Sequence, residues 1–254
     1  MENRRGEVSE HESACARVAA QFPERWLRGY VESKLRRDPI FPAAYELFRG
    51  SETRILDIGC GVGLLAYYLR ERGCRQPILG LDLDMRKIRR GISIASHYDD
   101  IDLRSQDIQG PMPAFCGNIA LFDVLHYLSP AEQTSLLSRL ARSVAPGGGL
   151  LVIRDCPRDN GPRFWMTFAA EKFAQAVSWN LNTPLHFPPR ERITAAFNEA
   201  EFERKSWPLW GVTPFNNHLF IFRRCGSGAV RVEESRTDSR ARPARSGSIP
   251  GTGD

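Results

Sequence analysis

Seven short runs of apolar and β-branched residues predict β-strands, because each is bounded by polar or turn-forming residues. They cover residues 53–59, 77–82, 101–107, 118–123, 149–155, 201–207 and 218–224. The runs at 53–59, 118–123 and 149–155 are apolar nearly throughout. This pattern is typical of central strands that are buried on both faces of a parallel sheet.

Helical patterns at 64–73, 85–98 and 130–148 lie between these runs. Alternation of strand and helix in units of about 30 residues predicts a parallel sheet with helices on both faces. The last two runs are separated only by residues 208–217, which leaves no room for a crossover helix. We therefore expect a Rossmann-like α/β fold with a seven-stranded, mostly parallel sheet and an antiparallel last strand.

The segments outside the sheet indicate how the domain is organised. Residues 22–39 form an amphipathic helical pattern that Pro39 stops, and we expect a helical lid over 22–50. A second pattern at 161–181 places aromatic residues at helical spacing, which predicts core or lid packing. Disordered tails are expected at 1–20 and 226–254, leaving one domain over 21–225.

Composition and charge narrow the class of protein. The net charge of +5 comes from 35 basic and 30 acidic residues that are interleaved, so nucleic-acid binding is permitted but not indicated. The six cysteines have no metal-like spacing, and we expect buried thiols, a reducing cytoplasm and no metal site. Neither a signal peptide nor a membrane-spanning segment is indicated.

The stretch "ILDIGCGVG" at 55–63 is a glycine-rich turn after a buried strand, a place where nucleotides bind. Gly59 and Gly61 fit the dinucleotide fingerprint, but its third place falls on Leu64, and Gly63 comes one residue early. Asp57 stands at the mouth of the turn, where its carboxylate would repel a phosphate and suit an ammonium or sulfonium. The motif therefore favours a cationic nucleoside.

In these residues the chain resembles the class I methyltransferases that use S-adenosyl-L-methionine, and the likeness runs from about Trp26 to Arg224. It implies that Asp57, Gly59, Gly61 and Gly63 hold the methionyl part of the cofactor. It also implies that Asp82 binds the ribose, that Asp107 reaches the adenine amine, and that Asp123, in "FDVLHYL" after the fourth strand, belongs to the cofactor site. Asp82 also fits a solvated strand end, and Asp107 fits a turn former.

Segments such as "DVLHYLSPAEQ" and "PLWGVTPFNNHLF" are similar to the small methyltransferases of bacterial aryl polyene and xanthomonadin pigment clusters. This resemblance implies an acceptor that is a phenolic aryl head group or an aryl polyene intermediate, which a carrier protein could hold. It leaves open whether oxygen or carbon receives the methyl group. The oligomeric state is also open.

A phenol needs to lose its proton to become a good nucleophile, and its ordinary pKa is about 10. His126 follows the fourth strand at the edge where ligands bind in open α/β folds, so we expect it to be the general base. A histidine that packs or caps the next helix is the alternative. Asp155, which ends the fifth strand at the same edge, is the second candidate.

The acceptor site should be completed by the lid and the last loop. Tyr30 and Lys34 lie one helical turn apart, although a solvated helix face explains Lys34 as well. The loop before the last strand should overhang the acceptor and offer Trp207, Trp210, Phe215, Asn216 and Asn217 for substrate binding. Alternatively, its aromatic residues cap the sheet core and its asparagines shape a turn. His11, His97 and His186 are expected to be structural.

Other functions compete with methyl transfer to a small molecule. A protein of the same fold could bind the cofactor without catalysis, and a dinucleotide-dependent oxidoreductase is disfavoured by Leu64. A protein or nucleic-acid methyltransferase is a further alternative. Amino methylation of bases usually goes with an Asn/Asp-Pro-Pro-aromatic motif, where this chain has "DVLH".

Overall fold

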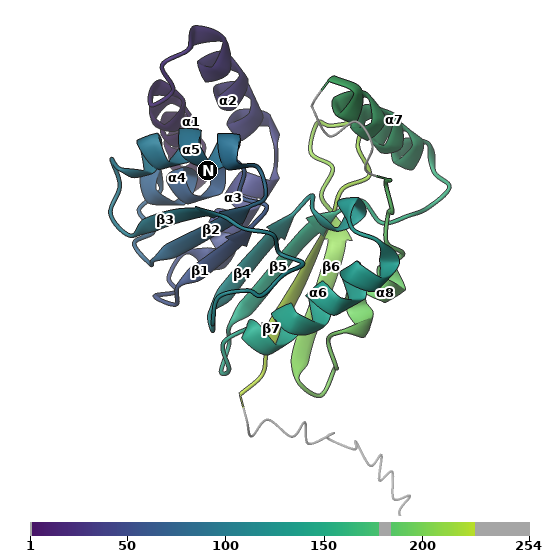
Figure 1. The fold of residues 1–254 in the computed structure, drawn as a ribbon. Coiled ribbons are helices and arrows are strands. Elements are labelled where there is room, and N and C mark those ends of the chain that lie inside the picture. Colours follow the sequence, from purple (N-terminus) through teal and green to yellow (C-terminus); the bar gives the residue numbers. More distant parts are fainter. Residues whose placement is uncertain (1, 178–183, 227–254) are drawn as a thin grey trace, which may run out of the picture.

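The computed structural model describes residues 2–177 and 184–226, and Figure 1 shows their fold. Seven strands form one sheet in the order β3-β2-β1-β4-β5-β7-β6. Six strands run parallel, and β7 is antiparallel to both of its neighbours, β5 and β6. The predicted fold class is therefore confirmed. The strands are β1 (Ile55–Ile58), β2 (Ile78–Asp82), β3 (Ile101–Ser105), β4 (Asn118–Phe122), β5 (Leu150–Asp155), β6 (Phe202–Pro208) and β7 (His218–Arg224).

Helices cover both faces of the sheet because alternate strand residues point to opposite sides. Ile55 packs with α1 to α5 in one apolar core, whereas the next residue, Leu56, packs with α6 and α8 in the other. The helices are α1 (Glu2–Ala20), α2 (Arg25–Arg37), α3 (Ile40–Phe48), α4 (Leu64–Glu71), α5 (Met85–Ala95), η1 (Leu125–Tyr127), α6 (Pro130–Ser143), α7 (Pro162–Val177) and α8 (Arg190–Ala195).

Helix α1 replaces most of the disordered tail that the sequence predicts for residues 1–20, so that prediction is wrong. Ala14, Cys15, Val18 and Ala19 are all buried. These four residues form only a narrow apolar stripe, and the residues between them are mostly polar. The sequence therefore shows too weak a periodicity to predict a helix here. The Nδ1 atom of His11 also lies 2.7 Å from the hydroxyl of a residue in α4, Tyr68. Helix α1 thus belongs to the domain.

The other predicted tail, residues 226–254, lies outside the described residues except for Gly226. All six cysteines are free thiols. Cys15, Cys74 and Cys156 are buried as expected, but Cys116 is exposed because it lies in the irregular segment before β4. Among the described helices, none is both long and apolar enough to cross a membrane.

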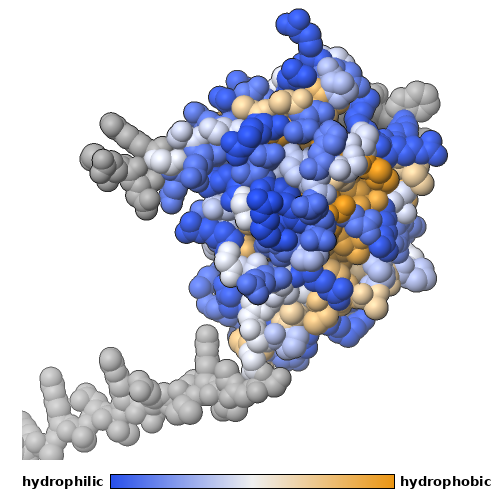
Figure 2. All heavy atoms as spheres, turned by 90° about the vertical axis from the view of Figure 1, so that its left-hand side faces the viewer, coloured by the Kyte–Doolittle hydropathy of each residue, from blue (hydrophilic) through white to orange (hydrophobic). Residues whose placement is uncertain are grey.

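One edge of the sheet is formed by β3, on the left in Figure 1, and the other by β6. Figure 2 looks onto this side, which is mostly hydrophilic with an apolar band along one margin. Asp102 and Arg104 are exposed on β3 and form an ion pair of 2.5 Å. Charged side chains on an edge strand disfavour pairing with another sheet.

The strand order reverses between β1 and β4, which lie side by side in the sheet. In open α/β folds, ligands bind beyond the carboxyl ends of the strands at such a switch point. Helices α2 and α7 rise beyond this edge on opposite sides, as Figure 1 shows. The fold therefore places the glycine turn after β1 next to the space between α2 and α7.

Candidate active site

The turn between β1 and α4 depends on glycine at three positions. Gly59, Gly61 and Gly63 have φ angles of 76°, 59° and 90°, which side-chain-bearing residues rarely adopt. A Cβ atom at Gly59 would approach Cγ2 of Val124 to 2.3 Å. At Gly61 a Cβ atom would meet no atom of the described residues within 4 Å. The backbone at Gly61 therefore borders open space, as a ligand cradle requires.

Two carboxylates lie at this turn. The Asp57 side chain is buried, and it accepts no hydrogen bond from the residues that the structure describes. Burial, together with the nearby Asp82 carboxylate, raises the pKa of Asp57 to about 7. Asp82 accepts hydrogen bonds from the backbone N–H groups of Gly61, at 2.9 Å, and Asp84, at 2.8 Å. An unpaired, buried carboxylate suits a cationic ligand, as the sequence predicts.

The two later acids of the predicted cofactor site have other partners. Asp107 is exposed and accepts a hydrogen bond of 2.9 Å from the N–H of Gln109, the contact expected of a turn former. Asp123 has a φ of 57°, and both of its carboxylate oxygens bind the guanidinium of Arg154. The role of Asp107 in adenine binding stays a prediction, whereas the carboxylate of Asp123 is already engaged.

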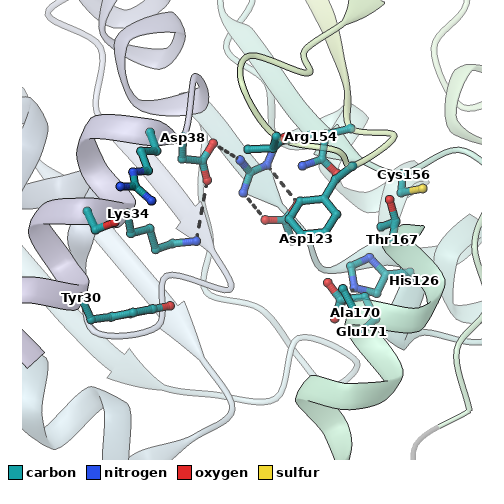
Figure 3. Close-up of a pocket in the computed structure, with 15 residues that line it drawn as sticks. Tyr30, Lys34, Asp38, Asp123, His126, Arg154, Cys156, Thr167, Ala170 and Glu171 are labelled. Atoms are coloured by element: carbon teal, nitrogen blue, oxygen red, sulfur yellow. Dashed lines mark hydrogen bonds and ion pairs between the residues drawn. The ribbon is translucent and has the colours of Figure 1, made fainter. Parts of the chain in front are cut away.

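Arg154 is the centre of a buried ion network that joins β5 to the lid helix. Its guanidinium binds Asp123 after β4 and Asp38, the residue that ends α2. Burial raises the pKa of Asp38, but Arg154 and Lys34 outweigh it and bring this pKa below its usual value. Figure 3 shows these ion pairs between α2 and the sheet. The network fixes α2 over the carboxyl edge of the strands.

His126, in η1, is held on one side by the second predicted catalytic residue, Asp155. Its Nδ1 atom lies 2.9 Å from Oδ1 of Asp155. Asp155 is fully buried and also accepts hydrogen bonds from the N–H groups of Leu125 and Cys156, at 2.9 and 2.8 Å. Because its oxygens are occupied in this way, Asp155 is a residue that orients His126 rather than a free base.

The other side of His126 faces a carboxylate that the sequence analysis missed. Its Nε2 atom lies 3.8 Å from Oε2 of Glu171 in α7, which also accepts a hydrogen bond of 2.7 Å from the Tyr127 hydroxyl. Burial lowers the pKa of His126, but the carboxylates of Asp155 and Glu171 outweigh it and raise this pKa to about 10. In this arrangement His126 is an imidazolium at neutral pH, and its Nε2 proton has no hydrogen-bond acceptor among the described residues.

A cavity of about 310 Å³ opens between α2 and α7, and the Arg154 ion network, His126 and Glu171 all line it. Figure 3 shows Tyr30 and Lys34 facing Thr167, Ala170 and Glu171 across it, with His126 at the α7 side. It is lined by Tyr30, Ser33, Lys34, Arg37, Asp38, Asp123, His126, Arg154, Cys156, Thr167, Ala170, Glu171, Thr213, Phe215 and Asn217.

Of the residues predicted to bind substrate, Tyr30 and Asn217 line this cavity, together with Phe215 of the predicted loop. Trp207, Trp210 and Asn216 do not line it, and their role in substrate binding stays a prediction. They have other positions in the structure. Trp207 lies on the edge strand β6, Trp210 packs under the guanidinium of Arg163, and Asn216 is buried with hydrogen bonds to Pro157 and Asp159.

Glu171 and Arg37 were not among the predicted site residues, and the sequence gives only weak indications of their role. Glu171 is the lone acid in a helix rich in aromatic and small residues, one turn after Thr167. Arg37 lies one turn after Lys34 on α2. Neither signal places the residue in a site until α2 and α7 are known to face each other.

Most of the chain matches a known family. A family model described as "Methyltransferase domain" matches residues 25–206. This range includes the glycine turn, both carboxylates beside it, His126 and Glu171.

Two curated relatives are enzymes of small-molecule methylation by name. A trans-aconitate 2-methyltransferase of Methylobacterium nodulans is 34% identical over 117 residues, which are 44% of this chain and 43% of the relative. A ubiquinone biosynthesis O-methyltransferase of Xylella fastidiosa is 30% identical over 105 residues, 40% of this chain and 42% of the relative. The chain thus spans less than half the length of these relatives.

Solved structures share the fold at low identity. The N-methyltransferase NodS from Bradyrhizobium japonicum, solved in complex with S-adenosyl-L-homocysteine, superposes with a TM-score of 0.54 at 18% identity. The match covers 75% of this chain and 90% of NodS. At this identity the likeness supports the fold alone.

Proposed function

The chain belongs to the methyltransferase-domain family, and we propose that it transfers a methyl group to a hydroxyl oxygen of a small molecule bound between α2 and α7. The coarser activity, methyl transfer that depends on S-adenosyl-L-methionine, follows from the family. The hydroxyl acceptor, and the residues that act on it, are our proposal.

The residues at the β1 turn fit the cofactor, S-adenosyl-L-methionine. When bound, it supplies an electrophilic methyl group on a sulfonium. We propose that the unpaired carboxylate of Asp57 faces the positive charge of this ligand and that the open backbone at Gly61 lies against it. Asp82, which is fixed by the N–H of Gly61, is proposed to bind the ribose hydroxyls.

One observation supports a hydroxyl acceptor above all others: the buried Nε2 atom of His126 has no hydrogen-bond partner in the described chain. Its distance of 3.8 Å to Glu171 is too long for a hydrogen bond. Buried polar atoms without a partner are rare in folded proteins and call for an explanation. A hydroxyl bound here would accept a hydrogen bond from Nε2 and donate one to Glu171, so both groups would be satisfied.

This arrangement changes the role that the sequence predicts for His126. An imidazolium whose Nδ1 also donates to Asp155 has no lone pair with which to take a proton. We propose instead that His126 positions the acceptor oxygen and stabilises the partial negative charge that this oxygen gains as its proton moves to Glu171. While the bond from the acceptor oxygen to the methyl carbon forms, the bond from that carbon to the sulfonium sulfur would break, and the hydroxyl proton passes to Glu171 and then to solvent. A weakly basic carboxylate suffices for this step.

The acceptor we favour is a phenolic aryl compound, as the resemblance to the pigment-cluster methyltransferases implies. Tyr30 and Phe215 supply aromatic surface in the cavity, and Asn217 supplies a polar group. Binding of a carrier protein and a cytoplasmic location stay predictions from the sequence.

Substitution of His126 and Glu171 tests this proposal with cofactor binding as the reference. His126→Ala and Glu171→Gln should each lower turnover by roughly 10², while calorimetry shows almost unchanged affinity for S-adenosylmethionine. His97→Ala is the matched control, because His97 is exposed and its side chain has a hydrogen bond only with Gln21 among the described residues. Unchanged turnover in both variants, or equal losses of turnover and cofactor affinity, would contradict the assignment.

A further inference from the structure

One face of α2 is built to contact whatever occupies the cavity. Tyr30, Ser33, Lys34 and Arg37 line the cavity at the spacing i, i+3, i+4 and i+7, which places them on one side of a helix. The buried apolar residues of α2, which include Val31 and Leu35, lie on another side and hold the helix on the domain. All four residues that face the cavity are polar or amphipathic, and two of them are cations.

All but one of the cations that line the cavity lie against a carboxylate. Asp38 and Asp123 both bind the buried guanidinium of Arg154, and Glu171 faces the imidazolium of His126. Lys34 is 3.7 Å from Asp38, a carboxylate that Arg154 already binds. Lys34, His126 and Arg154 thus lie against the carboxylates of Asp38, Asp123, Asp155 and Glu171, and Arg37 is the lining cation without a carboxylate partner among the described residues.

Arg37 is the cation that this arrangement leaves over. It is exposed, it lines the cavity, and it has no hydrogen bond or ion pair with any residue that the structure describes. A free guanidinium offers a planar, bidentate donor set that matches a carboxylate. Arg37 lies on α2 three residues after Lys34, and Figure 3 places Lys34 across the cavity from Glu171 of α7.

We propose that the acceptor carries a carboxylate, which Arg37 binds with help from Lys34 at the α2 side, while the acceptor's hydroxyl lies at His126 and Glu171. The substrate class is therefore a free hydroxyaryl carboxylic acid. This inference rests on the proposed function. The cavity volume of about 310 Å³ is near the lower limit for ligand pockets and suits a compound with one ring. A carboxylate already joined to a carrier protein as a thioester would have no charge for Arg37 to bind.

Matched acceptor pairs test the inference directly. The probes are the ortho, meta and para hydroxybenzoates and their methyl esters, with kcat/KM measured by mass spectrometry of the methylated products. For the hydroxybenzoate isomer that is methylated fastest, the kcat/KM of the wild-type protein should be about tenfold or more higher for the acid than for its methyl ester. This ratio is the effect of one charge-assisted hydrogen bond. Arg37→Gln should raise KM for the acid about tenfold, leave kcat within about twofold, and leave the ester unaffected. Lys34→Gln should act in the same direction.

Arg36→Gln is the matched control, since Arg36 is the neighbouring arginine of α2, pairs with Glu32 at 2.9 Å and does not line the cavity. It should keep the wild-type preference for acids. Equal use of acid and ester by the wild-type protein, or an unchanged preference in Arg37→Gln, would overturn the carboxylate inference and leave hydroxyl methylation standing. If neither acids nor esters are methylated by protein that binds the cofactor, the proposed function itself fails.

Discussion

Asp57 is a buried carboxylate whose environment in the protein alone disfavours its charge. Burial and Asp82 raise its pKa from 3.8 to about 7, so the folded protein holds this proton more tightly than the unfolded chain. The contribution of Asp57 to the free energy of unfolding therefore falls as the pH rises from about 4 to 7, and it stays low above that range. A cationic ligand would offset this loss.

We predict opposite effects of Asp57→Asn on stability and on cofactor binding. Above pH 7 the variant without cofactor should melt at least about 3 °C higher than the wild-type protein, because it lacks the buried charge. Its affinity for S-adenosylmethionine should fall at least about tenfold. Thermal unfolding at pH 5 and pH 8, with and without cofactor, measures both effects. A variant that is less stable at pH 8 and binds the cofactor normally would contradict this role.

His126 allows a second prediction about protonation. Asp155 and Glu171 together raise its pKa to about 10, so the stability that its charge contributes is fully present below about pH 6.5 and is lost as the pH rises through about 10. Glu171→Gln removes one of the two carboxylates and should lower the pKa of His126.

Titration of the imidazole signals by NMR measures this pKa without any acceptor. The His126 signal should stay in its protonated position beyond pH 8 in the wild-type protein and titrate at lower pH in Glu171→Gln. A wild-type His126 that is neutral at pH 7 would return it to the role of general base.

The sequence predicts the site residues that lie at strand ends, but it does not predict the site residues on α2 and α7. Asp57 lies near the end of β1, Asp82 ends β2 and His126 follows β4, so the strand pattern alone places them at one edge of the sheet. Glu171 and Arg37 reach the site only because α7 and α2 face each other beyond that edge. Their role depends on a tertiary contact that no local pattern encodes.

At the scale of elements, the position of the lid helix α2 depends on an ion network. Arg154 is 4% exposed and binds the carboxylates of Asp38 and Asp123. Removing the guanidinium would leave two carboxylates without their partner in a buried place, which costs more than the pair itself gains.

We predict that Arg154→Met lowers the free energy of unfolding by about 3–5 kcal/mol. The matched control is Arg104→Met, because Arg104 also lies on a strand and pairs with an aspartate but is exposed. Its loss should leave the free energy of unfolding almost unchanged. Urea unfolding compares the two variants. Similar losses in both would show that the network contributes no more than a surface ion pair.

Helix α1 is the element that the hydrophobic pattern of the sequence did not predict. Strands and long amphipathic helices were predictable because their apolar periodicity is strong, but α1 buries only a small stripe of residues in a polar segment. Val18 is fully buried, whereas Val8 on the same helix is 58% exposed.

A matched pair of substitutions tests whether α1 is part of the domain. Val18→Asp should destabilise the protein by at least about 2 kcal/mol, because it buries a charge in the core. Val8→Asp should change stability by less than about 0.5 kcal/mol. Urea unfolding at pH 7 measures both. Equal, small effects would instead support the disordered tail predicted from the sequence.

At the scale of the whole molecule, the sheet edge brings two sites together. The cofactor residues follow β1 and β2, and the acceptor cavity lies beyond β4 and β5, next to them in the sheet. The order of strands made this arrangement predictable from the sequence. The identity of the acceptor was not predictable, because it depends on how α2, α7 and the last loop close around the cavity.

The most direct test of the central claim is to follow the methyl group itself. The protein is incubated with S-adenosylmethionine labelled with carbon-13 in its methyl group and with the panel of hydroxybenzoates, and the products are analysed by carbon NMR. The account predicts a labelled methyl carbon bonded to oxygen, formed by the wild-type protein and reduced about a hundredfold in His126→Ala. Label bonded to a ring carbon, or no transfer by protein that binds the cofactor, would contradict it.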